Sequence, residues 1–347
     1  MQTVAQVSEG QLLALFMPVL AEHNERAEDV RARLGAPGAL VLGPGDDSAA
    51  LDLRGGLTVM STDTQTENQD FRRSWPSGYT TGGYEVGWKA ATQNLADIAA
   101  MGATPVTLLV SLTLTPDTPV SWVQDFARGL TESCTAQGAT TCTIAGGDMG
   151  SGSEISVTVT AVGLTYRPIT RSGARPGDAV VFAGALGTAA AGLALLDSDP
   201  FTATEELTAC VRAQQRPRSP LYLGPEGAPY LTSLMDVSDG LVCDGGRIAS
   251  ASGVALDLDS ASLDPWLEVV RPAAGLLGGE NPAQVESLAL RWLLTGGEDH
   301  GLLGTCPPEQ IPPGFTRIGR VQAGEGITVD GRTYTAKGWD HFEAGSR

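Results

Sequence analysis

Short clusters of aspartate, flanked by glycine or by hydroxyl residues, recur along this chain of 347 residues. They lie in the segments GPGDDSAA, STDT, NLADIAAMG, AGGDMG and MDVSDGL, which contain Asp46, Asp47, Asp63, Asp97, Asp148, Asp236 and Asp239. Mg²⁺ prefers oxygen ligands, so a fold that gathers these side chains would bind hard divalent cations. Carboxylates repel phosphate groups unless a cation lies between them. The clusters therefore predict magnesium-dependent chemistry on a phosphorylated ligand.

The elements that would position these residues alternate between helices and strands. The clearest is a helix from Tyr84 to Met101, whose apolar residues recur at helical spacing and which carries Gln93 and Asp97 on one side. Predicted strands at Leu57–Ser61 and Thr140–Ala145 would deliver Asp63 and Asp148 just beyond their ends. Carboxylates at strand ends indicate an α/β organisation.

Further predicted elements complete the chain. They are a helix at Gln11–Glu22, strands at Val106–Thr113, Ile155–Leu164, Ala179–Ala183 and Leu288–Leu294, and helices from Val120 and over Gly240–Ser252. A domain boundary is expected near Tyr166–Pro176. The small-residue segment GALGTAAAG opens a helix, where backbone amides can approach an anion or glycines can allow close helix packing; both interpretations stay open.

The composition excludes several classes of protein. With 42% hydrophobic residues the chain can bury sizeable cores, and its length favours two domains. Forty acidic residues against 22 basic ones give a formal charge of −18, and no Lys/Arg-rich run offsets it. Nucleic acids and anionic membranes need a basic footprint, so neither is an expected partner.

Cysteines, targeting signals and common motifs narrow the expectation further. The five cysteines form no CxxC pair, which favours reduced, structural thiols. The chain lacks a signal-peptide layout and the apolar stretch Leu12–Leu20 is too short to span a bilayer, so a cytoplasmic location is expected. The sequence contains no P-loop, no kinase HRD or DFG set and no GxSxG elbow, so phosphate chemistry needs another architecture.

Eight segments in one order resemble the thiamine-monophosphate kinase family. They are GPGDDSAAL, STDT, NLADIAAMGATP, AGGDMG, TRSGARPGD, MDVSDGL, LTGGED and KGWDHF, and they extend from Gly43 to Phe342. The resemblance implies a two-domain α/β (α+β) fold of the aminoimidazole ribonucleotide synthetase type. Residues 1–165 would form a metal-binding, ATP-binding and dimerisation domain, and residues 166–347 a C-terminal α/β domain. In the implied homodimer, the N-terminal sheets pair into a barrel.

The same resemblance implies an activity and a set of site residues. The activity is transfer of the γ-phosphoryl group of ATP to thiamine monophosphate, assisted by several Mg²⁺ ions. The implied metal positions are Asp47, Ser61, Thr62, Asp63, Asp97, Asp148, Asp236 and Asp239, of which Asp63, Asp148 and Asp239 are taken as catalytic. The implied ATP contacts are Gly147, Asp148, Arg171 and Ser238, and the implied substrate contacts are Glu298 and Trp339. Asp70 is a third predicted substrate contact, because it stands where the family has a substrate-contacting residue.

Each of these residues also has an ordinary structural interpretation. Asp46 and Asp47 suit a simple turn, Asp97 suits a solvated helix end, and Trp339 suits packing. Asp236 and Asp239 suit N-caps of the helix that follows Gly240. The order of the eight segments is what favours the metal site over these alternatives.

The chain departs from the family pattern at three places. TENQDF stands where the family commonly has VEGxHF, which puts Asp70 at the position of a substrate-contacting histidine. GGED is followed by His300 and Gly301 instead of Tyr-Glu, and GGD by Met149 instead of Thr. An acid at position 70 repels a phosphate and attracts a thiazolium, so these changes bear on the acceptor more than on phosphoryl transfer.

Competing functions can be separated by sequence features. Selenophosphate synthetase would need a reactive cysteine or selenocysteine near the N-terminus, whereas the first cysteine here is Cys134. The related hydrogenase-maturation protein carries a C-terminal cysteine, whereas this chain ends with Gly345, Ser346 and Arg347. An aminoimidazole ribonucleotide synthetase-like enzyme is the nearest alternative, and a non-catalytic nucleotide- or metal-binding dimer is the alternative from another class.

Overall fold

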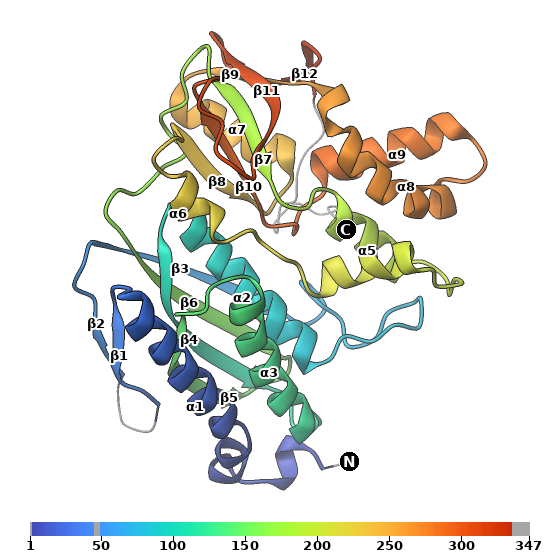
Figure 1. The fold of residues 1–347 in the computed structure, drawn as a ribbon. Helices are drawn as coiled ribbons and strands as arrows, with labels where there is room; N and C mark the ends of the chain where they lie inside the picture. Colours follow the sequence, from blue (N-terminus) through green and yellow to red (C-terminus); the bar gives the residue numbers. More distant parts are fainter. Residues whose placement is uncertain (1, 45–48, 335–347) are drawn as a thin grey trace. The chain divides into compact units, whose positions relative to one another are not determined.

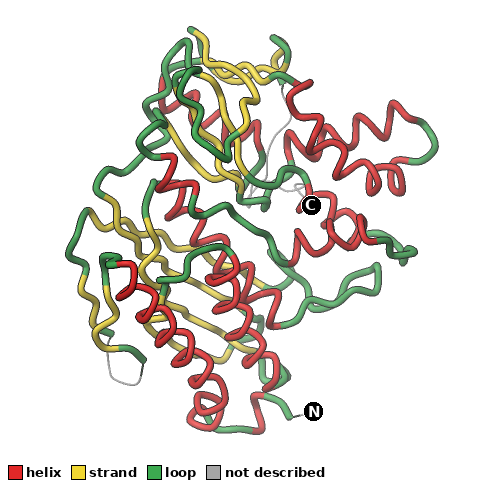
Figure 2. The backbone as a smooth tube through the Cα atoms, viewed as in Figure 1, coloured by secondary structure: helices red, strands yellow, loops and turns green. Residues whose placement is uncertain are grey.

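The structure, a computed structural model, describes residues 2–44 and 49–334. The chain folds into two compact units (Figure 1). Unit 1 comprises Met1–Trp75, Tyr79–Ala99 and Ala103–Pro168, and unit 2 comprises Pro76–Gly78, Ala100–Gly102 and Ile169–Arg347. Both units combine helices with β-sheets, which confirms the mixed α/β class (Figure 2).

Unit 1 contains a four-stranded sheet in the order β3-β6-β4-β5 and a two-stranded sheet, β1-β2. Only the pair β4 and β5 is parallel in the larger sheet. Helices α1, α2 and α3 lie over one face of it (Figure 1). The elements of the unit are α1 (Glu9–Leu34), β1 (Ala39–Leu42), β2 (Ala50–Asp52), β3 (Leu57–Thr66), α2 (Gly83–Ala100), β4 (Thr104–Leu114), α3 (Val120–Ala136), β5 (Thr143–Ser151) and β6 (Ser156–Thr165), with a 3₁₀ turn at Val4–Gln6.

Unit 2 is built on a seven-stranded sheet in the order β13-β12-β9-β11-β7-β10-β8. Its strands are β7 (Ala179–Ala183), β8 (Ser233–Val237), β9 (Ala255–Leu258), β10 (Gly301–Cys306), β11 (Thr316–Gln322), β12 (Gly326–Val329) and β13 (Arg332–Thr333). Its helices are α4 (Thr188–Leu196), α5 (Glu205–Gln215), α6 (Leu223–Gly227), α7 (Leu241–Ser252), α8 (Asp264–Gly278) and α9 (Pro282–Thr295), with a 3₁₀ turn at Ser260–Leu263.

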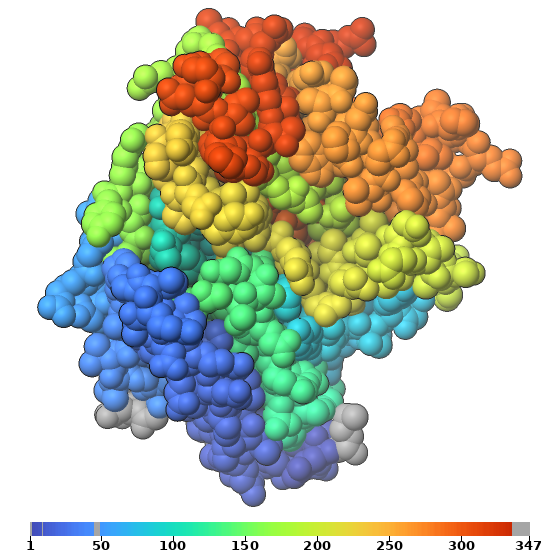
Figure 3. Space-filling view, viewed as in Figure 1, coloured from blue at the N-terminus to red at the C-terminus, as the bar shows by residue number. Residues whose placement is uncertain are grey.

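Strands β7, β8 and β10 form the core of unit 2 because both of their faces are covered. Leu302 packs on one face with Leu223 of α6. The next residue, Leu303, points to the other face, where it lies against Gly245 of α7. Helices α8 and α9 pack against each other and project at the edge of this unit (Figure 3).

Several predicted elements are confirmed, and three need correction. The helix predicted from Tyr84 is α2, and the strands predicted at Ile155–Leu164 and Ala179–Ala183 are β6 and β7. The strand predicted at Leu288–Leu294 is wrong, because these residues lie in α9. Asn281 caps that helix through its side chain, and Ala289, Trp292 and Leu293 are buried at helical spacing.

The second correction concerns the two strands expected to end before aspartate. Strand β3 continues to Thr66 and β5 to Ser151, so Asp63 and Asp148 lie inside strands. Pairing with β6 and with β4 carries these strands past the glycine and aspartate residues. Tertiary hydrogen bonding here outweighs the local turn preference of Asp-Gly segments.

The third correction lies at the start of the chain, where the predicted helix Gln11–Glu22 is the first half of α1. The buried polar residues His23, Asn24 and Arg31 extend the helix because they hold the start of β5. The Asn24 side chain accepts a hydrogen bond from the Ile144 N–H (2.7 Å) and donates one to the Ile144 carbonyl (2.9 Å). His23 Nε2 lies 2.7 Å from the Cys142 carbonyl. The helical spacing of His23, Ala27 and Arg31 is a sequence signal for this face.

The His23 contact predicts a pH dependence of stability. Burial lowers the pKa of His23 below its ordinary value of 6.5. The folded state therefore favours neutral His23, so stability is complete above about pH 6.5 and falls as pH decreases toward the folded-state pKa. The slope from one proton is at most about 1.4 kcal/mol per pH unit. We expect His23→Gln to remove this slope in urea unfolding between pH 7.5 and 5; an unchanged slope would assign it to other groups.

Candidate metal and nucleotide site

In unit 1, one face of β3 carries predicted metal ligands toward helix α2. The Ser61 hydroxyl donates a hydrogen bond to Asp97 Oδ2. The Asp63 N–H donates to Asn94 Oδ1 (3.1 Å), and Gln65 Nε2 donates to Gln93 Oε1 (3.0 Å). Residues 61, 63 and 65 share a face because strand side chains alternate, so Ser61, Asp63 and Asp97 belong to one polar region.

Thr62 belongs to the opposite face of the same strand. Its hydroxyl donates to the Val159 carbonyl (3.1 Å) and lies 3.0 Å from Thr160 Oγ1 of β6. Thr64 makes the same kind of contact with Thr158 Oγ1 (2.8 Å). The structure therefore does not bring the Thr62 side chain together with those of Ser61 and Asp63.

Gly147 and Asp148 lie on β5, beside β4. Asp148 is exposed and pairs in register with Ser111. A Cβ atom on Gly147 would lie 1.7 Å from the Val110 carbonyl oxygen, so this position requires glycine. Asp47, the remaining predicted ligand of this half, lies outside the described residues.

The close approach of Gly147 to the Val110 carbonyl can be tested by substitution, with Gly150 of the same strand as the control. Gly147→Ala forces β4 and β5 apart, and we expect it to destabilise unit 1 by about 1–3 kcal/mol or more. A Cβ atom on Gly150 would have its nearest neighbour, Thr113 Oγ1, at 4.0 Å. Gly150→Ala should change stability by less than about 0.5 kcal/mol. Equal effects of the two substitutions in urea unfolding would contradict the steric argument.

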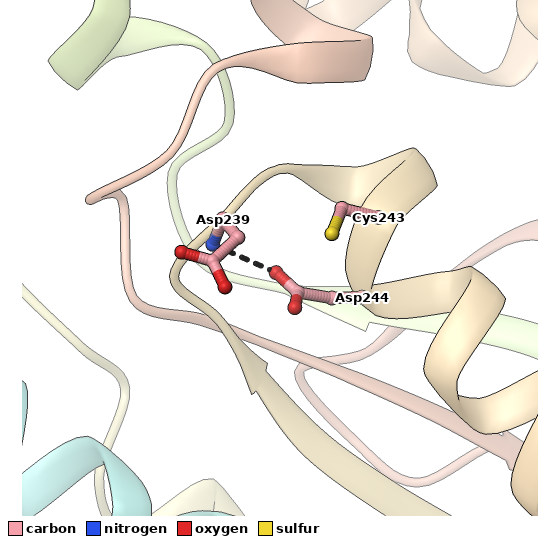
Figure 4. A group of neighbouring side chains, drawn as sticks. All are labelled: Asp239, Cys243 and Asp244. Atoms are coloured by element: carbon pink, nitrogen blue, oxygen red, sulfur yellow. Dashed lines mark hydrogen bonds between the residues drawn. The ribbon is translucent and has the colours of Figure 1, made fainter. Parts of the chain in front are cut away.

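In unit 2, Asp236 lies in strand β8, and Ser238 and Asp239 lie in the turn between β8 and α7. Asp244, in the first turn of α7, accepts a hydrogen bond through Oδ2 from the Ser238 N–H (3.1 Å). The same oxygen accepts a second one from the Asp239 N–H (2.9 Å; Figure 4). Gly240 is the N-cap residue of α7, and neither aspartate makes a side-chain cap bond there. The interpretation of Asp236 and Asp239 as N-caps is therefore wrong.

Asp239, Cys243 and Asp244 are neighbours in this turn (Figure 4). Among the described residues, they are the only three His, Cys, Asp or Glu side chains whose potential ligand atoms all lie within 4.8 Å of one another. Arg247 bonds both carboxylates, Asp239 Oδ2 at 2.5 Å and Asp244 Oδ1 at 2.6 Å. Burial raises the pKa of Asp244 to about 7, while its hydrogen bond from the Asp239 N–H acts in the opposite direction.

The segment that precedes β10 contains Glu298 and His300, and it contacts both Asp236 and Ser238. His300 Nδ1 lies 3.3 Å from Asp236 Oδ2, and both side chains are buried. The Glu298 N–H donates to the Ser238 carbonyl (2.9 Å), and Gln214 of α5 donates to Glu298 Oε2 (3.2 Å). The predicted nucleotide contact Ser238 and the predicted substrate contact Glu298 are thus bonded neighbours.

Asp299 accepts hydrogen bonds from the backbone amides of the segment GALGTAAAG, where the sequence left an anion-binding site open. Its carboxylate accepts from the Gly187 N–H (2.5 Å), the Ala189 N–H (2.9 Å) and the Thr188 hydroxyl (2.8 Å). Cβ atoms on Gly187 and Gly192 would collide with Leu293 and with the Cys210 carbonyl. Of the two interpretations, close helix packing is therefore confirmed at this segment, and an external anion is not needed.

Three predicted site residues remain: Asp70, Arg171 and Trp339. Asp70 accepts a hydrogen bond from the Thr66 N–H (2.7 Å), and its carbonyl accepts one from Lys89 Nζ (3.2 Å). Its carboxylate therefore closes the turn after β3. Arg171 is exposed, and its carbonyl accepts from the Ser252 hydroxyl (3.1 Å). Trp339 lies outside the described residues.

The donor types in both units fit Mg²⁺. Ser61, Asp63 and Asp97 present hydroxyl and carboxylate oxygens from one region of unit 1, and Asp239 presents a carboxylate in unit 2. Oxygen donors of this kind suit a hard cation better than nitrogen or sulfur donors.

No helix among the described residues combines the length and apolar character of a membrane span.

Comparisons with known proteins agree with these observations. The family described as "AIR synthase related protein, N-terminal domain" matches residues 45–165. A thiamine-monophosphate kinase of Aquifex aeolicus is 36% identical over 306 residues, covering 86% of this chain and 92% of the relative. The thiamine-monophosphate kinase of Mycobacterium tuberculosis (strain H37Rv) is 36% identical over 337 residues, covering 95% of each chain.

A solved structure is also similar over most of the chain. The structure of AaThiL complexed with AMPPCP and TMP superposes with a TM-score of 0.72 and 32% identity, covering 91% of this chain and 95% of that one. This similarity confirms the aminoimidazole ribonucleotide synthetase-like fold expected from the sequence. Together with the identity to full-length curated relatives, it shows that this chain belongs to the thiamine-monophosphate kinase family of enzymes.

Proposed function

We propose that this protein catalyses the ATP-dependent phosphorylation of thiamine monophosphate to thiamine diphosphate. The observation that carries the proposal is similarity over almost the whole length to thiamine-monophosphate kinases, including a structure complexed with AMPPCP and TMP. AMPPCP carries a methylene group in place of the β,γ-bridging oxygen of ATP. The proposal therefore takes ATP as phosphoryl donor. It takes Mg²⁺ as cofactor because the hydroxyl and carboxylate donors of both units suit this cation.

Within this proposal, roles are assigned to the predicted site residues that the structure describes. In unit 1, Ser61, Asp63, Asp97 and Asp148 would hold Mg²⁺, with Asp148 and Gly147 also beside ATP; in unit 2, Asp236 and Asp239 would hold Mg²⁺. Ser238 and Arg171 would bind nucleotide phosphates, and an arginine guanidinium can do so with two parallel hydrogen bonds. Glu298 would contact the thiamine moiety, with Gln214 fixing its carboxylate at 3.2 Å.

The proposed chemistry is direct in-line transfer without a phosphoenzyme. The second pKa of a phosphate monoester is about 6, so the acceptor is largely a dianion at neutral pH and needs no general base. Bound Mg²⁺ ions would supply charge neutralisation between the two polyanions. The protein would contribute positioning: Ser61 and Asp63 lie on β3 and Asp97 on α2, where the Ser61 hydroxyl donates to Asp97 and the Asp63 N–H donates to Asn94.

We also propose that the protein acts as a homodimer through the open face of the four-stranded sheet in unit 1. Met60 of β3 and Leu109 of β4 are 68% and 45% exposed on this sheet. Thr62 and Thr64 fill the same face of β3 with paired hydroxyls. An apolar and threonine-rich sheet face of this kind favours burial against a second sheet.

A direct assay tests the proposed function. The purified protein is incubated with Mg²⁺, ATP and thiamine monophosphate, and thiamine diphosphate and ADP are quantified by chromatography. A parallel reaction offers the formylated amidine precursor of aminoimidazole ribonucleotide as the alternative substrate. We expect thiamine diphosphate and ADP in equal amounts. Binding of Mg²⁺ and ATP without either product would support a non-catalytic nucleotide-binding dimer, and a covalent phosphoprotein trapped during turnover would exclude direct transfer.

A further inference from the structure

Asp244 is a buried carboxylate that is not among the site residues predicted from the sequence. Its side chain is fully buried in the first turn of α7. One oxygen, Oδ2, accepts hydrogen bonds from two consecutive backbone N–H groups, those of Ser238 and Asp239. Two such bonds from adjacent residues hold the orientation of the peptide plane between them. The direction of the Asp239 side chain therefore depends on Asp244 (Figure 4).

The second oxygen of Asp244 acts on the same turn through Arg247. Arg247 donates to Asp244 Oδ1 (2.6 Å) and reaches Asp239 Oδ2 (2.5 Å). Asp244 is fully buried, whereas the side chains of Asp239 and Arg247 are 23% and 40% exposed. Among Asp239, Asp244 and Arg247, Asp244 is therefore the carboxylate that a ligand cannot reach from solvent, and Asp239 is the carboxylate that it can reach.

The turn is also held from the side of Glu298. The Glu298 N–H donates to the Ser238 carbonyl (2.9 Å). A Cβ atom on Gly297 would lie 2.3 Å from the same carbonyl oxygen, so the two segments are in close contact. A shift of the Ser238–Asp239 turn would therefore displace the backbone at Glu298 as well.

From these contacts we propose that Asp244 is a positioning residue, which holds Ser238 and Asp239 in the orientation that binds the metal–nucleotide complex. The inference rests on the proposed function, since it assigns the nucleotide and the metal to that turn. It adds a residue that touches neither ligand and acts through two backbone N–H groups and one arginine. Removal of a residue that supports metal ligands in this way typically weakens metal binding by about 10–100-fold.

The test compares Asp244 with a matched buried carboxylate of the same unit. Asp257 is 8% exposed and accepts hydrogen bonds from the Gly331 N–H (2.8 Å), Thr328 Oγ1 (2.6 Å) and Arg320 (3.0 Å). Alanine and asparagine are placed at each position. Binding of Mg²⁺-AMPPCP is measured by calorimetry, unfolding is measured without ligand, and kcat and KM for ATP are measured at varied Mg²⁺.

We expect Asp244→Ala to raise the Kd for Mg²⁺-AMPPCP and the KM for ATP by about tenfold or more. Asp244→Asn should restore part of the affinity, because its amide oxygen can still accept the two N–H bonds. Asp257→Ala should lower the unfolding midpoint and leave both constants near the wild-type values.

Two results would overturn the inference: wild-type nucleotide affinity in folded Asp244→Ala, or an equal loss of affinity in Asp257→Ala. If Asp244→Ala does not fold, a wild-type Kd in Asp244→Asn together with wild-type Kd in Arg247→Gln overturns it. The proposed function fails separately, when the wild-type protein binds Mg²⁺-AMPPCP but makes no thiamine diphosphate. In that case, weakened binding in Asp244→Ala still supports the positioning role.

Discussion

Asp63→Asn is expected to lower kcat by about 10²–10³-fold while the protein remains folded, since the loss of a metal ligand removes several kcal/mol of charge stabilisation. Asparagine has the shape of aspartate but no charge, so it binds Mg²⁺ weakly. The backbone N–H of Asp63, which donates to Asn94 (3.1 Å), is unaffected by the substitution. Initial rates at saturating ATP and thiamine monophosphate measure the effect, and raising Mg²⁺ should recover part of it.

The control for this prediction is Asp29→Asn, the same chemical change at an exposed position of α1. It should leave kcat unchanged, and both variants should unfold at the wild-type temperature. If Asp63→Asn retained near-normal turnover at low Mg²⁺, Asp63 would not be a metal ligand. If it unfolded below the assay temperature, Asp97→Asn would test the same polar region.

Asp299→Ala is expected to destabilise unit 2 by about 3 kcal/mol or more, because it leaves three buried or partly buried donors without their acceptor. These donors are the Gly187 N–H, the Ala189 N–H and the Thr188 hydroxyl at the start of α4. Asp299 is 2% exposed, and water cannot take its place without repacking. Urea unfolding measures the loss, and hydrogen exchange should localise it to the first turn of α4.

Asp199→Ala is the matched control, because Asp199 is an exposed carboxylate shortly after the same helix. It should change stability by less than about 0.5 kcal/mol. Asp299→Asn, which keeps one acceptor oxygen, should fall between the two. A loss below about 1 kcal/mol in Asp299→Ala would show that the α4 amides find other acceptors.

Local periodicity predicted some elements well and failed at others for a physical reason. Helix α2 was predictable because apolar residues recur at helical spacing along its 18 residues. Leu288–Leu294 was not, because a short apolar run fits a buried strand as well as a helix, and the signals that distinguish them, the Asn281 cap and Pro282 in the first turn, lie outside the run. The interior positions of Asp63 and Asp148 depend on partners in β6 and β4, which no local window contains.

The functional residues divide in the same way. The sequence by itself determined the donor types, their order and hence the family, because aspartate, serine and glycine occur in segments that each carry their own local chemistry. It also identified Asp97 as a residue facing one side of α2. It did not identify Asn24, Gln214 or Asp244, since their roles depend on hydrogen-bond partners elsewhere in the fold.

Only the tertiary structure decided which of these residues are neighbours. It brought Ser61 to Asp97 across 36 positions of the chain, joined Ser238 to Glu298, and put the Thr62 hydroxyl on the opposite face from Asp63. It also gave the α4 amides to Asp299 instead of an external anion. The physical reason is that hydrogen bonds of buried groups are satisfied by whichever partner the packed elements place within about 3 Å, and that distance is a property of the fold.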